Sequence, residues 1–266
     1  MALTQMMQHY MQIKEKHKDC VVFYRLGDFY EMFFDDAVEV SKLLELTLTG
    51  RDCGLEERAP MCGIPYHAAE GYIARLVALG KKVAICEQLS DPAESKGLVD
   101  RDVIRIVSAG TIIEENLLDE KSSNYIACVY ADEGGNALAW ADITTGEFCV
   151  TEYFGEGATS AAIDQMLKLG VAEIIANDRF VELSADRKEF IHRTLPPVSS
   201  YLAWAFNVSG AERNLLEQFG TNTLAPFGIA GKSSCISAAG ALISYLQDTQ
   251  KHALKNLTSI PYQSEE

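Results

Sequence analysis

The stretch Arg25–Phe34, with the sequence RLGDFYEMFF, decides how the first part of the chain is expected to fold. An apolar run, Val21–Leu26, leads into it and predicts a buried strand that ends at Gly27 and Asp28. Asp28 is followed three residues later by Glu31, which is the spacing of a helix capping box. We therefore predict a strand that turns sharply into a helix at Asp28.

The predicted helix has one apolar face. Its apolar residues recur at spacings of three and four, as in a helix that packs on a core: Tyr30, Phe33, Phe34, Ala37, Val40 and Leu44. Phe29 lies outside this stripe, and Glu31 points away from it. Such a pair is either an accessory core residue beside a capping glutamate or a contact site for a ligand, since single exposed apolar residues are common.

Further short blocks follow one another in order along the chain. They are Met6–Gln8, Gly27–Glu31, Pro60–His67, Ala84–Gln88, Asp91–Pro92, Lys96–Gly97 and Arg105–Val107, followed by Gln218–Gly220 and Ala238–Gln250. Together these blocks closely resemble the amino-terminal part of the bacterial MutS family, the DNA mismatch-recognition proteins. The resemblance covers essentially the whole chain and implies a function in DNA mismatch repair.

The resemblance also implies which residues contact DNA. In the family, the aromatic residue of a Phe-x-Glu motif stacks on a mispaired or unpaired base from the minor groove, at a kinked site. The glutamate hydrogen-bonds to that base, either as an acceptor for a base N–H or as a protonated acid shared with a purine nitrogen. In this sequence the two positions are Phe29 and Glu31.

Arg51 is the best candidate for a contact with a DNA phosphate. It lies in a polar stretch, residues 50–58, that is rich in turn residues. A guanidinium on a loop can bind a backbone oxygen bidentately. The alternative interpretation is a solvated loop arginine.

The charge of the chain limits how it can bind DNA. The net charge is −15, with 13 basic and 19 acidic side chains in residues 1–118 and 10 and 19 in residues 119–266. Neither half has the basic surface of an autonomous DNA-binding protein. We therefore expect the isolated chain to bind duplex DNA weakly, with most phosphate contacts supplied by domains outside it.

The sequence predicts a soluble, cytoplasmic protein. It shows no signal peptide and no apolar run of the roughly 18 residues that a membrane span needs. Its seven cysteines are an odd number without a C-x-x-C pair. We interpret them as reduced thiols of the core rather than as metal ligands.

The expected fold class is α/β in two domains, for which 266 residues are sufficient. The expected parts are a mixed-sheet mismatch-recognition domain (1–116), a polar linker (117–124), a ribonuclease-H-like α/β connector domain (125–252) and the start of a truncated lever region (253–266). The connector prediction depends on three strand-like runs, 125–130, 137–143 and 148–153, which are separated by hairpin signals and followed by alternating helices and strands. Within it, Ser209 and Glu212 have the spacing of a second capping box.

The rival function is an enzyme that hydrolyses phosphodiesters with metal ions. A ribonuclease-H-like fold can hold two metal ions between carboxylates. The candidate residues are Asp142, Asp132, Glu147 and Asp178. Asp142 directly precedes a turn sequence, where a carboxylate needs no catalytic explanation. The sequence therefore favours a chain without enzymatic activity of its own.

The cofactors and partners follow mainly from the resemblance. Gly231–Ser233 is similar to the end of a phosphate-binding loop, but Pro226 occupies the position where that motif needs its first glycine. We expect no cofactor for this chain, because ATP and magnesium belong to an ATPase domain that lies further downstream in the family. The implied partners are mismatched double-stranded DNA and the protein MutL, and the connector would relay the DNA-bound state to the ATPase domain. Family members form homodimers through downstream regions, so we expect a monomer, without membrane contact.

Overall fold

The computed structural model describes residues 2–89, 100–112, 124–185, 195–250 and 254–264. The chain forms two compact units, Met1–Ala109 and Gly110–Glu266. Of the linker expected at 117–124, residues 117–123 lie outside the described residues. In the described parts, no helix is long and apolar enough to cross a membrane.

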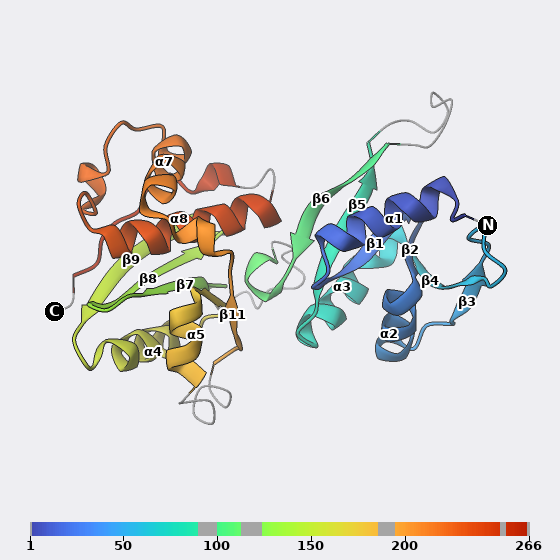
Figure 1. Ribbon diagram of the computed structural model, residues 1–266, viewed down its shortest axis with the longest axis horizontal. Coiled ribbons are helices and arrows are strands. Elements are labelled where there is room, and N and C mark those ends of the chain that lie inside the picture. Colours follow the sequence, from blue (N-terminus) through green and yellow to red (C-terminus); the bar gives the residue numbers. More distant parts are fainter. Residues whose placement is uncertain (1, 90–99, 113–123, 186–194, 251–253, 265–266) are drawn as a thin grey trace. The chain divides into compact units, whose positions relative to one another are not determined.

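The first unit is built on a mixed sheet of six strands in the order β3-β4-β2-β1-β5-β6 (Figure 1). The strands are β1 (Cys20–Leu26), β2 (Phe29–Phe33), β3 (Thr49–Arg51), β4 (Ala59–Pro65), β5 (Lys82–Gln88) and β6 (Arg101–Val107). Strands β1 and β5 are parallel, and the other neighbours are antiparallel. The mixed α/β sheet predicted for this part of the chain is confirmed.

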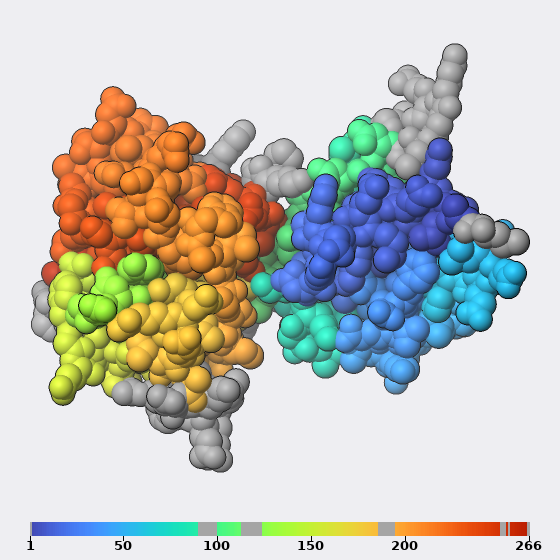
Figure 2. Space-filling model, viewed as in Figure 1, coloured from blue at the N-terminus to red at the C-terminus, as the bar shows by residue number. Residues whose placement is uncertain are grey.

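Helices cover both faces of this sheet. The helices are α1 (Gln5–Lys16), α2 (Phe34–Leu44) and α3 (Ala69–Ala78). The side chains of α1 cover one face, where the Tyr10 ring lies 5.1 Å from the Phe33 ring (Figure 2, dark blue). The thiol of Cys62 contacts the carbonyl oxygen of Ala37 at 3.6 Å, which places α2 on the opposite face, next to α3. Strand β2 therefore lies in the middle of a sheet that is covered on both sides.

The predicted helix start at Asp28 is wrong. Gly27, with φ +58°, lets the chain reverse within two residues, so that Leu26 pairs with Phe29 in a hairpin. Residues 29–33 are then a central strand that pairs with β1 and with β4, and the helix begins only at Phe34. Residues 29–32 alternate between more exposed and buried positions, as in a strand, although the spacing of the apolar residues also suits a helix. Pairing on both sides of the strand decides between them.

The second unit contains a five-stranded sheet in the order β11-β10-β7-β8-β9. The strands are β7 (Ile126–Ala131), β8 (Gly135–Asp142), β9 (Glu147–Phe154), β10 (Glu173–Ala176) and β11 (Val198–Ser200). Strands β7, β8 and β9 form an antiparallel meander, and β10 pairs parallel to β7 and to β11. The predicted order, a meander followed by alternating helices and strands, is confirmed.

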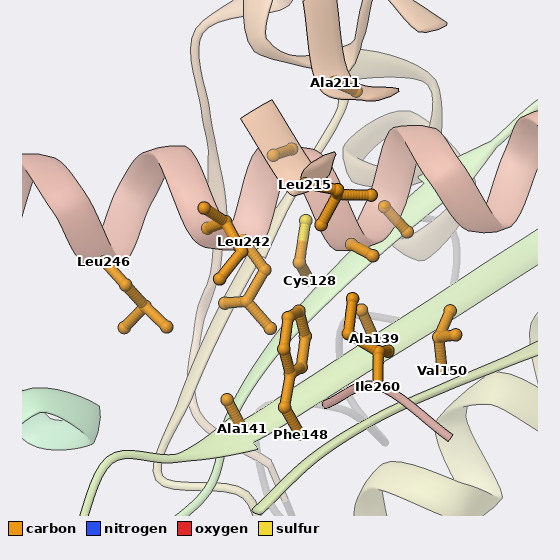
Figure 3. Close-up of a cluster of buried hydrophobic side chains, with 14 of the residues drawn as sticks. Cys128, Ala139, Ala141, Phe148, Val150, Ala211, Leu215, Leu242, Leu246 and Ile260 are labelled. Atoms are coloured by element: carbon orange, nitrogen blue, oxygen red, sulfur yellow. The ribbon is translucent and has the colours of Figure 1, made fainter. Parts of the chain in front are cut away.

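Two pairs of helices enclose this sheet (Figure 1). They are α4 (Ala158–Leu169) and α5 (Asp178–Ala185) on one face, and α7 (Val208–Phe219) and α8 (Ser233–Thr249) on the other. Figure 3 shows part of this core, in which Leu242 and Leu246 of α8 belong to the same buried cluster as Cys128 and Phe148 of the meander. This apolar burial is the main stabilising contribution to the second unit.

The contact between α7 and α8 depends on a glycine. A Cβ atom at Gly240 would lie 2.4 Å from the Cβ atom of Ala211, so the two helices meet where neither has a larger side chain. The capping box predicted at Ser209 and Glu212 is wrong, because the helix begins earlier. Asn207 caps it, accepting a hydrogen bond from the Gly210 amide at 3.1 Å.

Candidate nucleic-acid interface

The β1–β2 hairpin presents an exposed aromatic side chain at the start of a central strand. Phe29 is the first residue of β2 and is 47% exposed, whereas Met32 and Phe33 of the same strand are fully buried. Side chains two residues apart in a strand lie on the same face. Glu31 therefore projects from the same face of the sheet as Phe29. The structure places these two predicted residues on one face of a strand that is paired on both sides.

Arg51 joins this pair from a neighbouring part of the sheet. Its Nη1 atom lies 2.5 Å from Oε2 of Glu31, with the two side chains 40% and 15% exposed, respectively. Arg51 ends β3, and Glu31 lies on β2, with β4 between the two strands. The directly opposed residue of β4 is Gly63, whose missing side chain leaves the face open beside Glu31. All three residues predicted from the sequence thus form one cluster.

The loop after Arg51 is held by hydrogen bonds at its base. The Thr4 amide donates to the carbonyl oxygen of Cys53 at 2.9 Å, which ties the loop to the start of α1. Within the loop, Asp52 accepts a hydrogen bond from the Gly54 amide at 2.9 Å. Arg51 therefore extends from a segment whose backbone is fixed both by β4 and by the amino-terminal helix.

A second aromatic residue lies beside the hairpin and was not singled out from the sequence. Tyr66 is partly exposed, and its amide donates to the carbonyl oxygen of Asp28 at 3.0 Å. The guanidinium carbon of Arg25 lies 3.6 Å from the centre of the Tyr66 ring, a cation–π stack. Tyr66 directly follows Pro65, which pairs with Phe29. The sequence signal that could have identified Tyr66 is its aromatic side chain near the end of the Pro60–His67 block.

The carboxylates considered for metal-dependent hydrolysis have structural partners. Asp142 is buried and accepts hydrogen bonds from the Thr144 and Asn124 amides at 2.9 and 3.1 Å. Glu147 accepts from the Tyr125 hydroxyl at 2.6 Å, and Asp132 accepts from the Gly134 amide at 2.8 Å. Asp178 accepts from the Ser200 hydroxyl. Within the described ranges, no group of three or more His, Cys, Asp or Glu side chains could hold a metal ion.

The lysine of the phosphate-loop-like sequence has a structural role. Lys232 forms an ion pair with Glu152 of β9, and its ammonium group lies 4.2 Å from the centre of the Tyr262 ring. The hydrogen bond that the Lys232 ammonium donates to Glu152 raises the pKa of Lys232 above its usual value, although partial burial opposes this. The ion pair connects α8 to the outer strand of the second sheet.

The second unit contains a pocket of about 810 Å³ that the sequence did not reveal. Trp204, which is 64% exposed, lies at this pocket together with Tyr130 and the basic side chains of Arg179 and Arg213. An exposed tryptophan beside arginine side chains is typical of protein contact sites. Trp204 lies in a short 3₁₀ segment, Ala203–Phe206, that shows no helical or strand periodicity to identify it.

Comparison with known families and proteins gives matches along nearly the whole chain. The model of MutS domain I matches residues 4–116, and that of MutS domain II matches residues 124–260. The DNA mismatch repair protein MutS of Lachnoclostridium phytofermentans is 46% identical over 261 residues, which are 98% of this chain and 28% of that protein. The MutS proteins of Alkaliphilus oremlandii and of Clostridium botulinum strain 657 are 46% and 44% identical and cover 97% and 99% of the chain. The chain spans about 30% of the length of these relatives.

Proposed function

Because the chain belongs to the MutS family of DNA mismatch repair proteins, of which it carries domains I and II, we propose that its first unit recognises mismatched base pairs in double-stranded DNA. Phe29 stacks on the mispaired or unpaired base from the minor groove at a kinked site, and Glu31 hydrogen-bonds to that base. The observation that supports this most directly is the exposed Phe29 ring on a central strand, with Glu31 two residues further on the same face.

The position of Phe29 suits a side chain that probes the stiffness of DNA. Inserting an apolar side chain beside a base costs a few kcal/mol for each unstacked step, and less where pairing is already poor. Stacking the base on an aromatic ring returns roughly 1–3 kcal/mol. Because the two contributions are similar, their sum changes sign between matched and mismatched sites. The minor-groove edges differ too little between base pairs to supply this discrimination alone.

The backbone of β2 supports the Phe29 ring for insertion beside a base. Strand β2 is hydrogen-bonded to β1 on one side and to β4 on the other. The strand cannot move away from the DNA without breaking ladder bonds on both sides. A rigid support of this kind reduces the ordering cost that binding would otherwise carry.

The test is an amide NMR titration of the 266-residue chain with two short duplexes, one with a single G·T mismatch and one fully matched. NMR detects the weak binding expected of an acidic chain. We expect shifts centred on residues 27–32 and 49–54, larger for the mismatched duplex. Equal shifts for both duplexes, or shifts elsewhere only, would contradict the proposal. Magnesium-dependent shifts around Asp142, with strand cleavage, would favour the nuclease alternative instead.

For the second unit, we propose that the pocket at Trp204 contacts the protein MutL. Trp204 supplies an exposed aromatic anchor, and Arg179 and Arg213 supply positive charge in an otherwise acidic part of the chain. Aromatic and arginine side chains contribute most to protein interfaces. In the longer relatives, the second unit would relay the DNA-bound state to the ATPase domain, and its contact at Trp204 would relay that state to MutL.

The MutL contact can be tested with the natural fluorescence of Trp204. Titration with purified MutL of a related bacterium is expected to change the emission of Trp204. For the variants, binding is measured by isothermal titration calorimetry, and Trp204→Ala is expected to weaken it by at least tenfold, as for an interface hot spot. Phe154→Ala is the matched control, because Phe154 is a similarly exposed aromatic residue on β9 outside the pocket. Equal loss of binding in both variants would contradict the assignment of the pocket.

A further inference from the structure

The ion pair between Arg51 and Glu31 uses one nitrogen of the guanidinium and one oxygen of the carboxylate. Only one contact joins the two side chains, from Nη1 of Arg51 to Oε2 of Glu31. Among the residues that the structure describes, neither side chain has another hydrogen-bond partner. One carboxylate oxygen and the remaining guanidinium N–H groups are therefore available to a ligand. A bidentate pair would have engaged both carboxylate oxygens and left fewer lone pairs for an incoming donor.

The surrounding backbone fixes where this pair can lie. Glu31 is opposed by Gly63 on β4, and a Cβ atom at that position would lie 3.4 Å from the Cγ atom of Glu31. A larger side chain would occupy the surface over which Glu31 reaches Arg51. On the other side, Arg51 pairs with Ala59 of β4 and precedes the loop that the Thr4 amide holds at Cys53. The carboxylate is thus held between two fixed strands.

The electrostatics of the cluster explain why a carboxylate can face DNA. An isolated carboxylate is repelled by the phosphates, and the chain as a whole is acidic. A guanidinium in direct contact neutralises the charge of Glu31 locally, so that the pair approaches the duplex without net charge. Since the Arg51 side chain is 40% exposed to solvent, the pair adds little to the stability of the fold. Its removal should leave the unit folded.

We propose that Arg51 is a positioning residue for Glu31. It holds one carboxylate oxygen and turns the other toward the base beside Phe29, as an acceptor for a base N–H. This inference rests on the proposed function of Phe29 and Glu31 in mismatch recognition. Thymine and guanine, which carry an imino N–H, are the bases that this acceptor fits.

A double-mutant cycle tests the coupling between the two residues. The variants are Arg51→Ala, Glu31→Ala and the double variant, and the measured quantity is the ratio of affinities for the G·T duplex and its matched twin. We expect each single variant to lower this ratio by about tenfold, the effect of one charged hydrogen bond. In the Glu31→Ala background, Arg51→Ala should change the ratio by less than about twofold, because nothing remains to be positioned.

Two further variants separate positioning from a simple phosphate contact. Arg51→Lys keeps the positive charge and an N–H donor group, so its affinity ratio should lie between those of Arg51→Ala and the wild type. Arg58→Ala removes the same charge from the same loop without touching Glu31 and should leave the ratio unchanged. If Arg51 only bound phosphate, Arg51→Ala would weaken both duplexes equally, and the salt dependence of log affinity would fall by about one. That result would overturn the inference.

A measurement on the free protein keeps the inference testable without DNA. NMR relaxation of the Glu31 side-chain carbons should show a side chain that is ordered in the wild type and mobile in Arg51→Ala, with no change in Arg58→Ala. An unchanged Glu31 side chain would refute the positioning role whatever the DNA experiments give. If the wild type shows no preference for the mismatch, the proposed function fails, and the relaxation data alone decide whether Arg51 fixes Glu31.

Discussion

Replacement of Phe29 by alanine should separate recognition from stability. A fully buried phenylalanine contributes about 3–5 kcal/mol to folding, measured as the cost of its truncation to alanine. Phe29 is 47% exposed, so roughly half of this contact area is absent in the free protein. We therefore expect Phe29→Ala to lower the free energy of unfolding by about 1–2 kcal/mol.

The same substitution should have a larger effect on the preference for mismatched DNA. Loss of base stacking removes about 1–3 kcal/mol from binding at the mismatch, which is a factor of about 5–150 in affinity. Matched DNA offers no displaced base to stack, so its weak binding should change little. The assay is the NMR titration with the G·T duplex and its matched twin, combined with urea unfolding of each variant.

Two control variants make the Phe29 result interpretable. Phe33→Ala removes a fully buried ring of the same strand and should lower the free energy of unfolding by about 3–5 kcal/mol. Leu79→Ala removes an exposed apolar side chain at the end of α3 and should affect neither unfolding nor binding. A Phe29→Ala variant that folds and keeps the wild-type preference for the mismatch would refute the stacking role.

Three further variants or conditions give independent tests. Glu31→Ala should weaken binding to the mismatched duplex by about tenfold and leave binding to matched DNA unchanged or slightly stronger, since a negative charge is lost; equal weakening of both duplexes in the titration would contradict this. Gly240→Ala should cost about 1–3 kcal/mol in urea unfolding, because the new Cβ atom would lie 2.4 Å from that of Ala211, whereas Gly71→Ala in α3 meets no neighbour and should be neutral or stabilising by up to about 1 kcal/mol. Burial raises the pKa of the Cys20 thiol from its ordinary value of 9.0 to about 12. The contribution of this thiol to stability is therefore complete below pH 9 and is lost as the pH rises toward 12. The free energy of unfolding should fall between pH 9 and 10, and it should fall less steeply in Cys20→Ala.

Much of the fold could be predicted because the period of the apolar residues is unambiguous in most elements. The strand-like runs predicted at 125–130, 137–143 and 148–153 are observed as β7, β8 and β9, each within one or two residues of its predicted bounds. The hairpin signals between the runs mark where each strand ends. The resemblance to a family then supplied the proposed role of Phe29 and Glu31, which the pattern of apolar residues alone left open between an accessory core pair and a ligand contact.

The predictions that were wrong, and the features that were missed, concern segments whose local structure is decided by long-range contacts. Residues 29–33 form a strand because β4, thirty residues later in the sequence, pairs with them. The contact between Arg51 and Glu31 crosses β4, and no local pattern indicates that β3 lies on that side of the sheet. The helix is capped by Asn207 and not by Ser209, although either residue type can cap a helix. The starting residue of α7 is consistent with the packing of Ala211 against Gly240 of α8, which is a long-range contact. The pocket at Trp204 joins three separate segments and has no signature in any one of them.

The most direct test of mismatch recognition is an intermolecular NOE measurement between the Phe29 ring and DNA. The chain would carry labelled phenylalanine rings and be mixed with the duplex that contains one G·T mismatch. We expect NOEs from the Phe29 ring to the mispaired base or its immediate neighbour, and none with the matched duplex. Binding without such contacts, or with equal contacts in both duplexes, would contradict the claim that this ring reads the mismatch.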